Sequence, residues 1–246
     1  MAPSRELWPG EVHVLWTETA DCEEAERCAE WEALLTDAER ERRDRFVVAR
    51  VRHEYLVTRA LARTTLAAYA GLDPRALEFE SNAWGRPEIA LPEAARALRF
   101  NLSNTIGLVA IAVARDIEVG VDVEDTQRRG ETVAVAHRFF AESEVRDLGL
   151  VPEEGRRARF FDYWTLKEAY IKARGMGLAI PLEQFAFSID GARVSIAFDP
   201  RLDDDPAAWQ FAQRSPTSRH RLSLAIRRGA REDLPLTFER VVPPAR

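Results

Sequence analysis

The sequence has few cysteines and no long apolar run, and these shortages exclude several classes of protein. Cys22 and Cys28 are the only cysteines, and neither has a CxxC partner or a histidine at metal-ligand spacing, so we expect free thiols and no zinc site. No apolar run approaches the roughly 20 residues of a membrane helix, and no basic and apolar leader opens the chain. We therefore expect a cytoplasmic protein that binds no membrane.

Charge and length set further limits. A chain of 246 residues with 46% hydrophobic and 31% charged residues has a globular composition and can form one large domain or two smaller halves. Its net charge of −6 argues against a nucleic-acid binder, which needs a basic surface for phosphate contacts.

Lysine is almost absent. Of 35 basic residues only Lys167 and Lys172 are lysines, and both lie in the segment 164–178. A coding bias toward arginine would explain the shortage but not the clustering. The alternative is that a compact ammonium, and not a planar guanidinium, is needed at these two positions.

The pattern of apolar and turn residues predicts strands and long helices in mixed order, which indicates an α+β fold. A capping-box spacing at 36–39 precedes a helical stretch that ends at Gly71. A third helix after the middle of the chain ends at Gly175 or Gly177. We expect strands over 11–16, 77–80, 99–102, 108–114, 117–123, 185–189, 194–198 and 221–226, and helices over 21–35, 36–70, 133–140, 143–148 and 156–174.

Two acidic residues share one face of a predicted strand. In GVDVED at 120–125, alternation places Asp122 and Glu124 on the face opposite the valines, about 7 Å apart. Carboxylates at this spacing can ligate one hard cation such as Mg²⁺. Taken alone, the same pattern is typical of a solvated strand face.

The lysine-containing segment carries a second charged pair. In WTLKEAYIK at 164–172, helical spacing places Glu168 and Lys172 one turn apart. Such a pair is often a surface ion pair. The shortage of lysine and the aromatic surroundings favour a partly buried pair that serves a metal-bound phosphate.

Together these segments resemble the two defining motifs of the Sfp-type 4′-phosphopantetheinyl transferases. The motifs are GVDVED at 120–125 and WTLKEAYIKARGMGL at 164–178. Three further elements are similar in order and spacing: the helix at 45–63, NAWGRPEI with FNLSNT at 82–89 and 100–105, and RFFAESEV at 138–145.

The resemblance implies a fold and a reaction. The fold would be two similar α+β halves, over 1–116 and 117–246, with the active site in the cleft between them. The enzyme would transfer phosphopantetheine from coenzyme A to a serine of an acyl, peptidyl or polyketide carrier protein and release adenosine 3′,5′-bisphosphate. By motif position Asp122, Glu124 and Glu168 would hold Mg²⁺, or Mn²⁺, against the diphosphate. Glu168 would also match the general base, Lys172 would contact the diphosphate, and Lys167 would assist or pack.

The resemblance also implies a cationic site for the 3′-phosphate of coenzyme A. Most relatives carry histidine after the serine of FNLSNT, whereas this chain has Asn104, which cannot become cationic. We expect weaker phosphate binding or a shifted pH dependence, with arginines compensating. The residues at matching positions are Arg42, Arg52, Arg63, Arg86, Ser103 and Asn104.

Partners and alternative functions complete the predictions. Carrier proteins are acidic around their serine, so we expect a basic and apolar docking segment between Arg138 and Arg159, in a monomeric enzyme. The alternatives are a Mg²⁺-dependent diphosphate hydrolase or nucleotide transferase, and a carrier-binding adaptor without catalysis.

Overall fold

The computed structural model describes residues 5–130 and 132–244, which form two compact units. The first unit combines the chain up to Asp116 with the segment that starts at Pro235, and the second unit is Ile117–Leu234. Both units contain helices packed on antiparallel strands, so the prediction of an α+β fold is confirmed. Within the described residues, no helix has the length and hydropathy needed to cross a bilayer.

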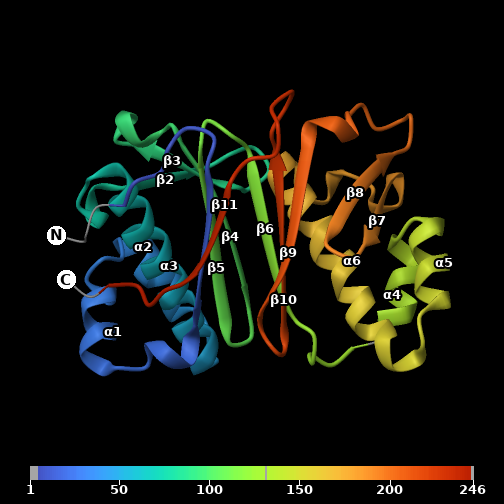
Figure 1. Cartoon of the computed structure of the whole chain (residues 1–246). Helices are drawn as coiled ribbons and strands as arrows, with labels where there is room; N and C mark the ends of the chain where they lie inside the picture. Colours follow the sequence, from blue (N-terminus) through green and yellow to red (C-terminus); the bar gives the residue numbers. More distant parts are fainter. Residues whose placement is uncertain (1–4, 131, 245–246) are drawn as a thin grey trace. The chain divides into compact units, whose positions relative to one another are not determined.

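The first unit is built on a four-stranded sheet with the order β11-β1-β5-β4 (Figure 1). Its central strand β5 is buried from Leu108 to Ala114, as its unbroken apolar sequence predicts. The long helix α3 packs on β5 and β4. The bounds are β1 (Val12–Glu18), β4 (Leu98–Thr105), β5 (Leu108–Arg115), β11 (Leu236–Arg240), α3 (Ala49–Ala70), α1 (Ala25–Glu32), α2 (Asp37–Asp44) and the hairpin β2 (Glu78–Ser81) and β3 (Pro87–Leu91).

The helix expected over 36–70 is two helices. Its capping box is present, because Thr36 Oγ1 accepts from the Glu39 amide and the Glu39 carboxylate accepts from the Thr36 amide. The chain leaves the helical conformation after Asp44 and re-enters it at Ala49. The end of α3 is as predicted, with Gly71 at φ +67°.

The C-terminal segment belongs to the first unit, which corrects the expected half of 117–246. Strand β11 pairs in parallel with β1, in the register Val12 with Leu236 and Trp16 with Arg240. Figure 1 shows β11 in red beside β1 in blue. Sequence pattern missed β11, because its five residues alternate weakly between half-buried and exposed.

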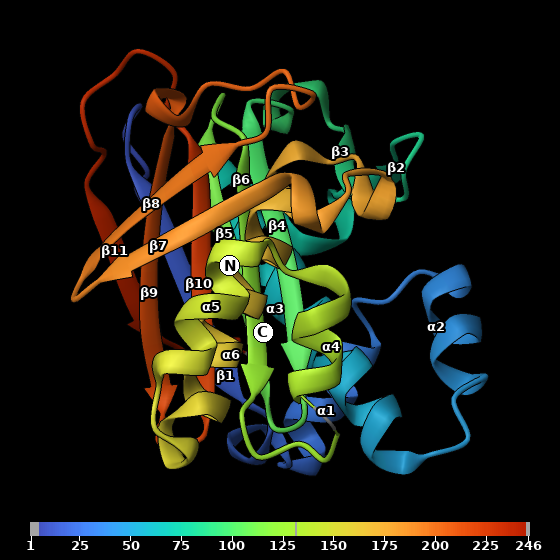
Figure 2. The same cartoon turned by 90° about the vertical axis from the view of Figure 1, so that its right-hand side faces the viewer.

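The second unit has a sheet, a long helix and a helical layer. The sheet has the order β6-β10-β9, helix α6 packs on β6 and β10, and α4 and α5 pack on α6 (Figure 1). Figure 2 looks onto α4 and α5 and shows the β7–β8 hairpin next to α5. The bounds are β6 (Val119–Asp125), β9 (Trp209–Thr217), β10 (His220–Arg227), α4 (Thr132–Phe139), α5 (Glu142–Leu150), α6 (Glu153–Arg174), β7 (Phe185–Asp190) and β8 (Arg193–Phe198).

Short 3₁₀ turns connect these elements. The helix expected over 21–35 is a 3₁₀ turn followed by the shorter α1. Strand β9 was not predicted, because its sequence mixes polar residues with Pro216 and only Trp209 and Ala212 are buried. The 3₁₀ turns are η1 (Thr19–Cys22), η2 (Pro74–Ala76), η3 (Glu93–Ala95), η4 (Gly177–Ala179), η5 (Leu182–Gln184) and η6 (Pro206–Ala208).

Gly120 sets the close approach of α6 to β6. A Cβ atom at this position would lie 2.1 Å from the Ala169 carbonyl oxygen and 2.4 Å from the Ala173 amide nitrogen. Only glycine leaves room for the helix backbone there. The face of β6 that carries Gly120 therefore packs closely on α6. The next side chains on this face, Asp122 and Glu124, face the helix.

Candidate active site

The candidate site is formed where β6 and α6 face each other. Strand alternation places Asp122 and Glu124 on the same face as Gly120, opposite Ser223 and Arg221 of β10 in the sheet register. Asp122 is 6% exposed and Glu124 is half-buried. The prediction of two carboxylates on one strand face is confirmed, but the face is covered by a helix and not solvated.

Helix α6 contributes three side chains one turn apart. Trp164, Glu168 and Lys172 follow each other at intervals of four residues and so lie along one stripe of the helix. The Trp164 indole Nε1 donates to Glu124 Oε1 at 3.1 Å. The Lys172 ammonium donates to Asp122 Oδ1 at 2.6 Å and to the Val121 carbonyl oxygen at 3.2 Å. The two ends of the stripe thus contact the two carboxylates of β6.

Glu168 lies between Trp164 and Lys172 on this stripe, and the pKa of its carboxyl is unusually high. Within residues 5–130 and 132–244, no side chain or amide forms a hydrogen bond or ion pair with its carboxylate. Burial raises the pKa of Glu168 to about 7; Asp122 and, less strongly, Glu124 add to the rise, which Lys172 opposes. Burial and the Asp122 charge raise the pKa of Glu124 as well. A carboxyl with a pKa near neutrality can exchange a proton under ordinary conditions.

In the chain alone the three carboxylates do not surround one ion position. Within the described part of the chain, no three His, Cys, Asp or Glu side chains are arranged to hold a metal ion. The Lys172 ammonium lies 2.6 Å from Asp122 Oδ1, and Arg128 Nε lies 3.2 Å from Glu124 Oε2. In the chain alone, an ammonium and a guanidinium balance these charges.

The donor set nevertheless fits a hard divalent cation. All three groups offer carboxylate oxygens, the ligand type that Mg²⁺ prefers. The Asp122 charge raises the pKa of both Glu124 and Glu168, and the Glu124 charge raises that of Glu168, which is a repulsion that a cation would relieve. Residues of the right chemistry are therefore present, and their side chains would have to turn from their present partners.

Lys167 lies in the core, which corrects its expected role in coenzyme A binding. Its side chain is fully buried, and its ammonium lies 2.7 Å from the equally buried Glu144 carboxylate. It also donates to the carbonyl oxygens of Leu182 and Phe185, at 2.8 and 2.7 Å. Glu144 Oε1 accepts from the Phe187 amide. All three ammonium protons are used, so this lysine ties α6 to α5 and β7.

The loop after β6 is held by an arginine of α6. Arg157 donates to the carbonyl oxygens of Thr126, at 2.6 Å, and of Arg128 and Gly130. The guanidinium carbons of Arg128 and Arg157 lie 5.4 and 5.3 Å from the centre of the Phe161 ring. Sequence reasoning assigned Arg157 to a docking surface and did not find this loop-fixing role, because carbonyl partners leave no sequence signal.

Comparisons with known proteins bear directly on this arrangement. Residues 118–226 match the family described as the 4′-phosphopantetheinyl transferase superfamily, and residues 24–116 match the one described as 4′-phosphopantetheinyl transferase, N-terminal. The chain is 33% identical over 214 residues to 4′-phosphopantetheinyl transferase HetI of Nostoc sp. (strain PCC 7120), which covers 87% of this chain and 86% of that protein. The chain belongs to the Sfp-type 4′-phosphopantetheinyl transferases.

Further relatives agree with this membership. A 4′-phosphopantetheinyl transferase of Bacillus subtilis is 32% identical over 166 residues, covering 67% of this chain and 71% of that protein. The 4′-phosphopantetheinyl transferase Sfp of Bacillus subtilis (strain 168) is 30% identical over 155 residues, covering 63% and 66%. The resemblance found in the sequence motifs is thus confirmed for the family.

In this phosphopantetheinyl transferase Arg63 is a core residue, which corrects its expected place at the 3′-phosphate. Its side chain is 1% exposed, and its Nε and Nη2 both donate to Glu39 Oε2, at 3.1 and 2.9 Å. It also donates to the carbonyl oxygens of Pro74 and Leu77. A guanidinium with these partners joins α2 to α3 and is closed off from a ligand.

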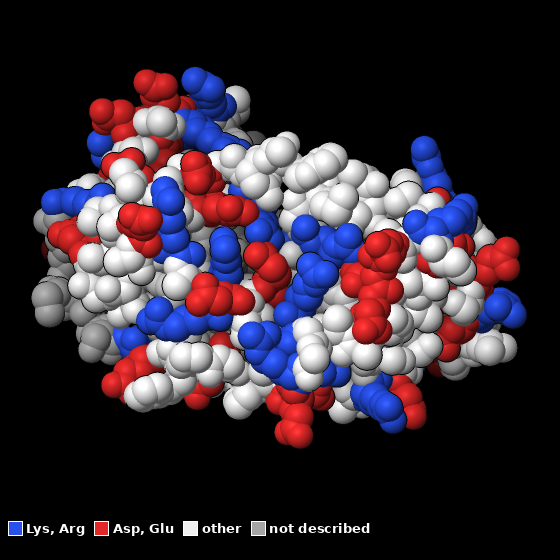
Figure 3. Space-filling model, turned by 90° about the horizontal axis from the view of Figure 1, so that it is seen from above, with Lys and Arg blue, Asp and Glu red and all other residues white. Residues whose placement is uncertain are grey.

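The other predicted phosphate residues of the transferase are more open. Arg42 is exposed, Arg52 is half-buried and donates to the carbonyl oxygens of Phe46 and Val47, and Arg86 pairs with Glu88 at 2.9 Å. On β4, Ser103 is buried and Asn104 is exposed. Figure 3 shows that basic and acidic side chains are interspersed on one face of the molecule, in keeping with these pairs.

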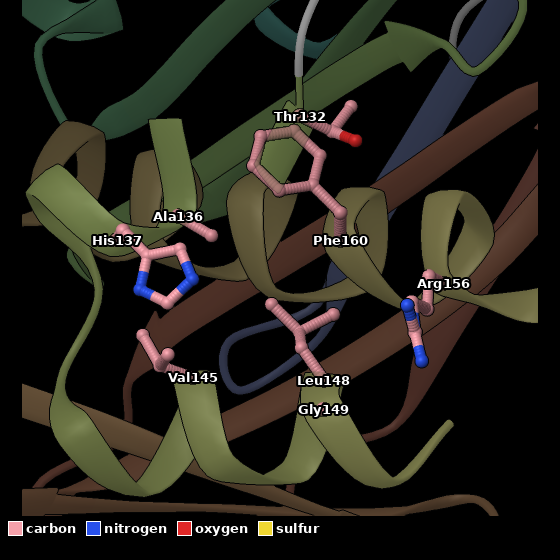
Figure 4. Close-up of a pocket in the computed structure, with 8 residues that line it drawn as sticks. All are labelled: Thr132, Ala136, His137, Val145, Leu148, Gly149, Arg156 and Phe160. Atoms are coloured by element: carbon pink, nitrogen blue, oxygen red, sulfur yellow. The ribbon is translucent and has the colours of Figure 1, made fainter. Parts of the chain in front are cut away.

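The transferase also has a pocket of about 200 Å³ among α4, α5 and α6 (Figure 4). The ring of Phe160 and the side chains of Val145 and Leu148 give it an apolar wall, and His137 and Arg156 are its largest polar groups. It overlaps the segment in which docking of a carrier protein was predicted. Its lining residues are Thr132, Ala136, His137, Val145, Leu148, Gly149, Arg156 and Phe160.

Proposed function

We propose that this protein transfers 4′-phosphopantetheine from coenzyme A to the serine hydroxyl of an acyl, peptidyl or polyketide carrier protein, with Mg²⁺ or Mn²⁺ as the cofactor. The observation that carries the proposal is the meeting of Asp122 and Glu124 of β6 with Glu168 and Lys172 of α6 in a member of this family. Three carboxylates and an ammonium have the charges that a reaction between a diphosphate and a hydroxyl needs, which supports the proposal.

The cation has one task in this proposal. Asp122, Glu124 and Glu168 would hold it, and when bound it would neutralise the diphosphate oxygens. The other groups act through their own chemistry. Lys172 would leave Asp122 to donate to a diphosphate oxygen, for which its compact ammonium is suited.

Glu168 is the proposed general base. In the metal-free chain its pKa is about 7, and a bound cation would lower this value, so that near neutral pH the carboxylate would be ionised and able to accept the serine proton, directly or through a water. The serine oxygen then forms a bond to the phosphorus next to pantetheine. The bond from this phosphorus to the bridging oxygen breaks, and adenosine 3′,5′-bisphosphate leaves with the electron pair.

The first unit would bind the 3′-phosphate of coenzyme A. Arg42 is exposed and Arg52 and Arg86 are half-buried, and these three are the remaining guanidinium groups that the resemblance indicates. Ser103 and Asn104 stay in the proposal as a hydroxyl and an amide donor. Planar guanidinium groups suit a phosphate, which they can bind through two parallel hydrogen bonds.

The pocket among α4, α5 and α6 is the proposed docking surface for the carrier. It combines an apolar wall with Arg156, and an acidic carrier helix complements such a surface. Arg146, on α5, is exposed, and Arg159 Nε, on α6, lies 3.6 Å from Asp147 Oδ2.

The reaction is tested with coenzyme A, Mg²⁺ and an apo carrier protein, followed by mass spectrometry of the carrier. We expect the serine to gain the mass of one phosphopantetheine group. Cleavage of coenzyme A without the carrier would favour the diphosphate hydrolase, and binding of the carrier without any modification would favour the adaptor.

Variants then test the residues. Asp122→Ala and Glu168→Ala should each lower transfer by more than about 100-fold, because electrostatic contributions of this kind reach that size. Lys172→Arg should also lose activity, since the guanidinium differs in shape and hydration. Asp199→Asn, in an exposed loop pair with Arg201, is the control and should keep wild-type activity.

A further inference from the structure

Glu124 is held on both oxygens, by partners of different kinds. Oε1 accepts from the Trp164 indole at 3.1 Å, and Oε2 lies 3.2 Å from Arg128 Nε. The Glu124 side chain is 18% exposed, whereas that of Arg128 is 41% exposed and comes from a loop. The helix-borne partner is therefore the more fixed of the two.

The Trp164 ring has little freedom to turn. It stacks on Phe160, with ring centres 5.9 Å apart and planes 16° apart, and on Phe140 at 6.4 Å and 30°. Phe140 and Phe160 stack on each other at 5.2 Å and 14°. Three rings packed in this way fix the direction of the indole N–H before any ligand arrives.

An indole differs from a cation as a partner of a carboxylate. Its N–H is a donor without charge, so it orients Glu124 and leaves the negative charge intact. A lysine or arginine at this position would neutralise the charge and compete with an incoming cation. An aromatic donor on α6 thus adds no second cation beside Arg128, which already pairs with the other Glu124 oxygen.

We propose that Trp164 is a positioning residue that holds the Glu124 carboxylate in the orientation needed to bind the divalent cation. The inference rests on the proposed function, since it takes Glu124 as a ligand. Trp164 combines ring packing with a polar contact in the structure. Partners that orient a ligand are worth about 10- to 100-fold in metal affinity.

Two substitutions separate the donor from the ring. Trp164→Phe keeps an aromatic ring in the stack and removes the N–H. Trp164→Gln removes the ring, and its amide nitrogen lies as many bonds from the backbone as the indole nitrogen does. Trp209→Phe is the matched control, because Trp209 Nε1 donates to Asp204 Oδ1 at the same 3.1 Å, away from the site.

The readout is the dissociation constant of Mn²⁺, measured by electron paramagnetic resonance with and without coenzyme A, alongside the melting temperature. We expect Trp164→Phe to weaken Mn²⁺ binding about tenfold, and Trp164→Gln to stay closer to wild type although it melts lower. Trp209→Phe should bind Mn²⁺ like wild type. In transfer assays, saturating Mg²⁺ should restore the kcat of Trp164→Phe, because only the KM for Mg²⁺ rises.

The results distinguish the inference from the function on which it rests. If Glu124→Gln weakens Mn²⁺ binding but Trp164→Phe does not, or if affinity follows the melting temperature and not the donor, Trp164 has no positioning role. If Glu124→Gln leaves Mn²⁺ binding unchanged, Glu124 is no ligand, and both this inference and the proposed metal site are wrong.

Discussion

Lys167 and Glu144 form an ion pair of 2.7 Å in which neither side chain reaches solvent. The ammonium has three protons and three partners, Glu144 and the carbonyl oxygens of Leu182 and Phe185. A planar guanidinium would not fit this arrangement. For the core position the structure thus favours a need for an ammonium over a coding bias, and for Lys172, at Asp122, this need stays a prediction that Lys172→Arg tests.

Removing the core lysine should unfold the protein more readily. In Lys167→Met the Glu144 carboxylate is left buried without a counter-charge, which costs about 3–5 kcal/mol of unfolding free energy. Lys167→Met with Glu144→Leu should recover much of this loss, because no unpaired charge remains. Urea titration measures both. Arg201→Met is the control: it removes an arginine from an exposed pair with Asp199 and should leave stability nearly unchanged.

Glu168→Gln should stabilise the protein at neutral pH and above. Burial raises the pKa of Glu168 from 4.5 to about 7 in the native state, so between these values the native protein binds a proton that the unfolded chain has released. The stability contributed by this group falls as the pH rises through this window. Glutamine cannot ionise, so the variant does not lose this stability as the pH rises.

The difference between Glu168→Gln and wild type should therefore grow from near zero at pH 4.5 to as much as about 3 kcal/mol above pH 7. Denaturation curves at pH 5 and pH 8 test this in the absence of divalent cations. A difference that does not change with pH would contradict the raised pKa. Transfer activity should be lost in the same variant.

Gly120→Ala should separate α6 from β6. The added methyl group would overlap the backbone of Ala169 and Ala173, and overpacking of this kind costs about 1–3 kcal/mol or more. Transfer should fall sharply, because Trp164 and Lys172 reach β6 only while the helix lies close. Gly149→Ala is the stability control: Gly149 is helical with open space around it, so alanine should be neutral or stabilise by up to about 1 kcal/mol.

Asn104→His should make coenzyme A binding depend on pH. A histidine here would be cationic below its ordinary pKa of about 6.5 and would attract the 3′-phosphate. Calorimetry should show binding up to about fivefold tighter than wild type at pH 6, and no difference at pH 8. Equal affinity of the two proteins at both pH values would mean that the phosphate lies elsewhere.

Much of the site could be predicted from the sequence, because its signals are local. Alternation along β6 and the one-turn interval between Glu168 and Lys172 place these side chains correctly. The contacts that decide whether a charged side chain is buried in the core or available to a ligand are not local. Lys167 and Arg63 match the motifs in sequence, but their partners Glu144 and Glu39 lie more than 20 residues away, and only the fold brings them together.

The fold was predicted least well at its edges. Strands β9 and β11 carry polar or weakly alternating residues, since an edge strand buries little of its surface. The break between α2 and α3 also escaped prediction, because 45–48 contain no glycine or proline to mark it.

The pairing of β11 with β1 has a consequence for biosynthesis. The chain leaves the first unit at Asp116, builds the whole second unit, and returns only at Pro235. A ribosome therefore completes the second unit while the sheet of the first unit still lacks its last strand. The first unit can complete its sheet only after the chain has been synthesised as far as Arg240.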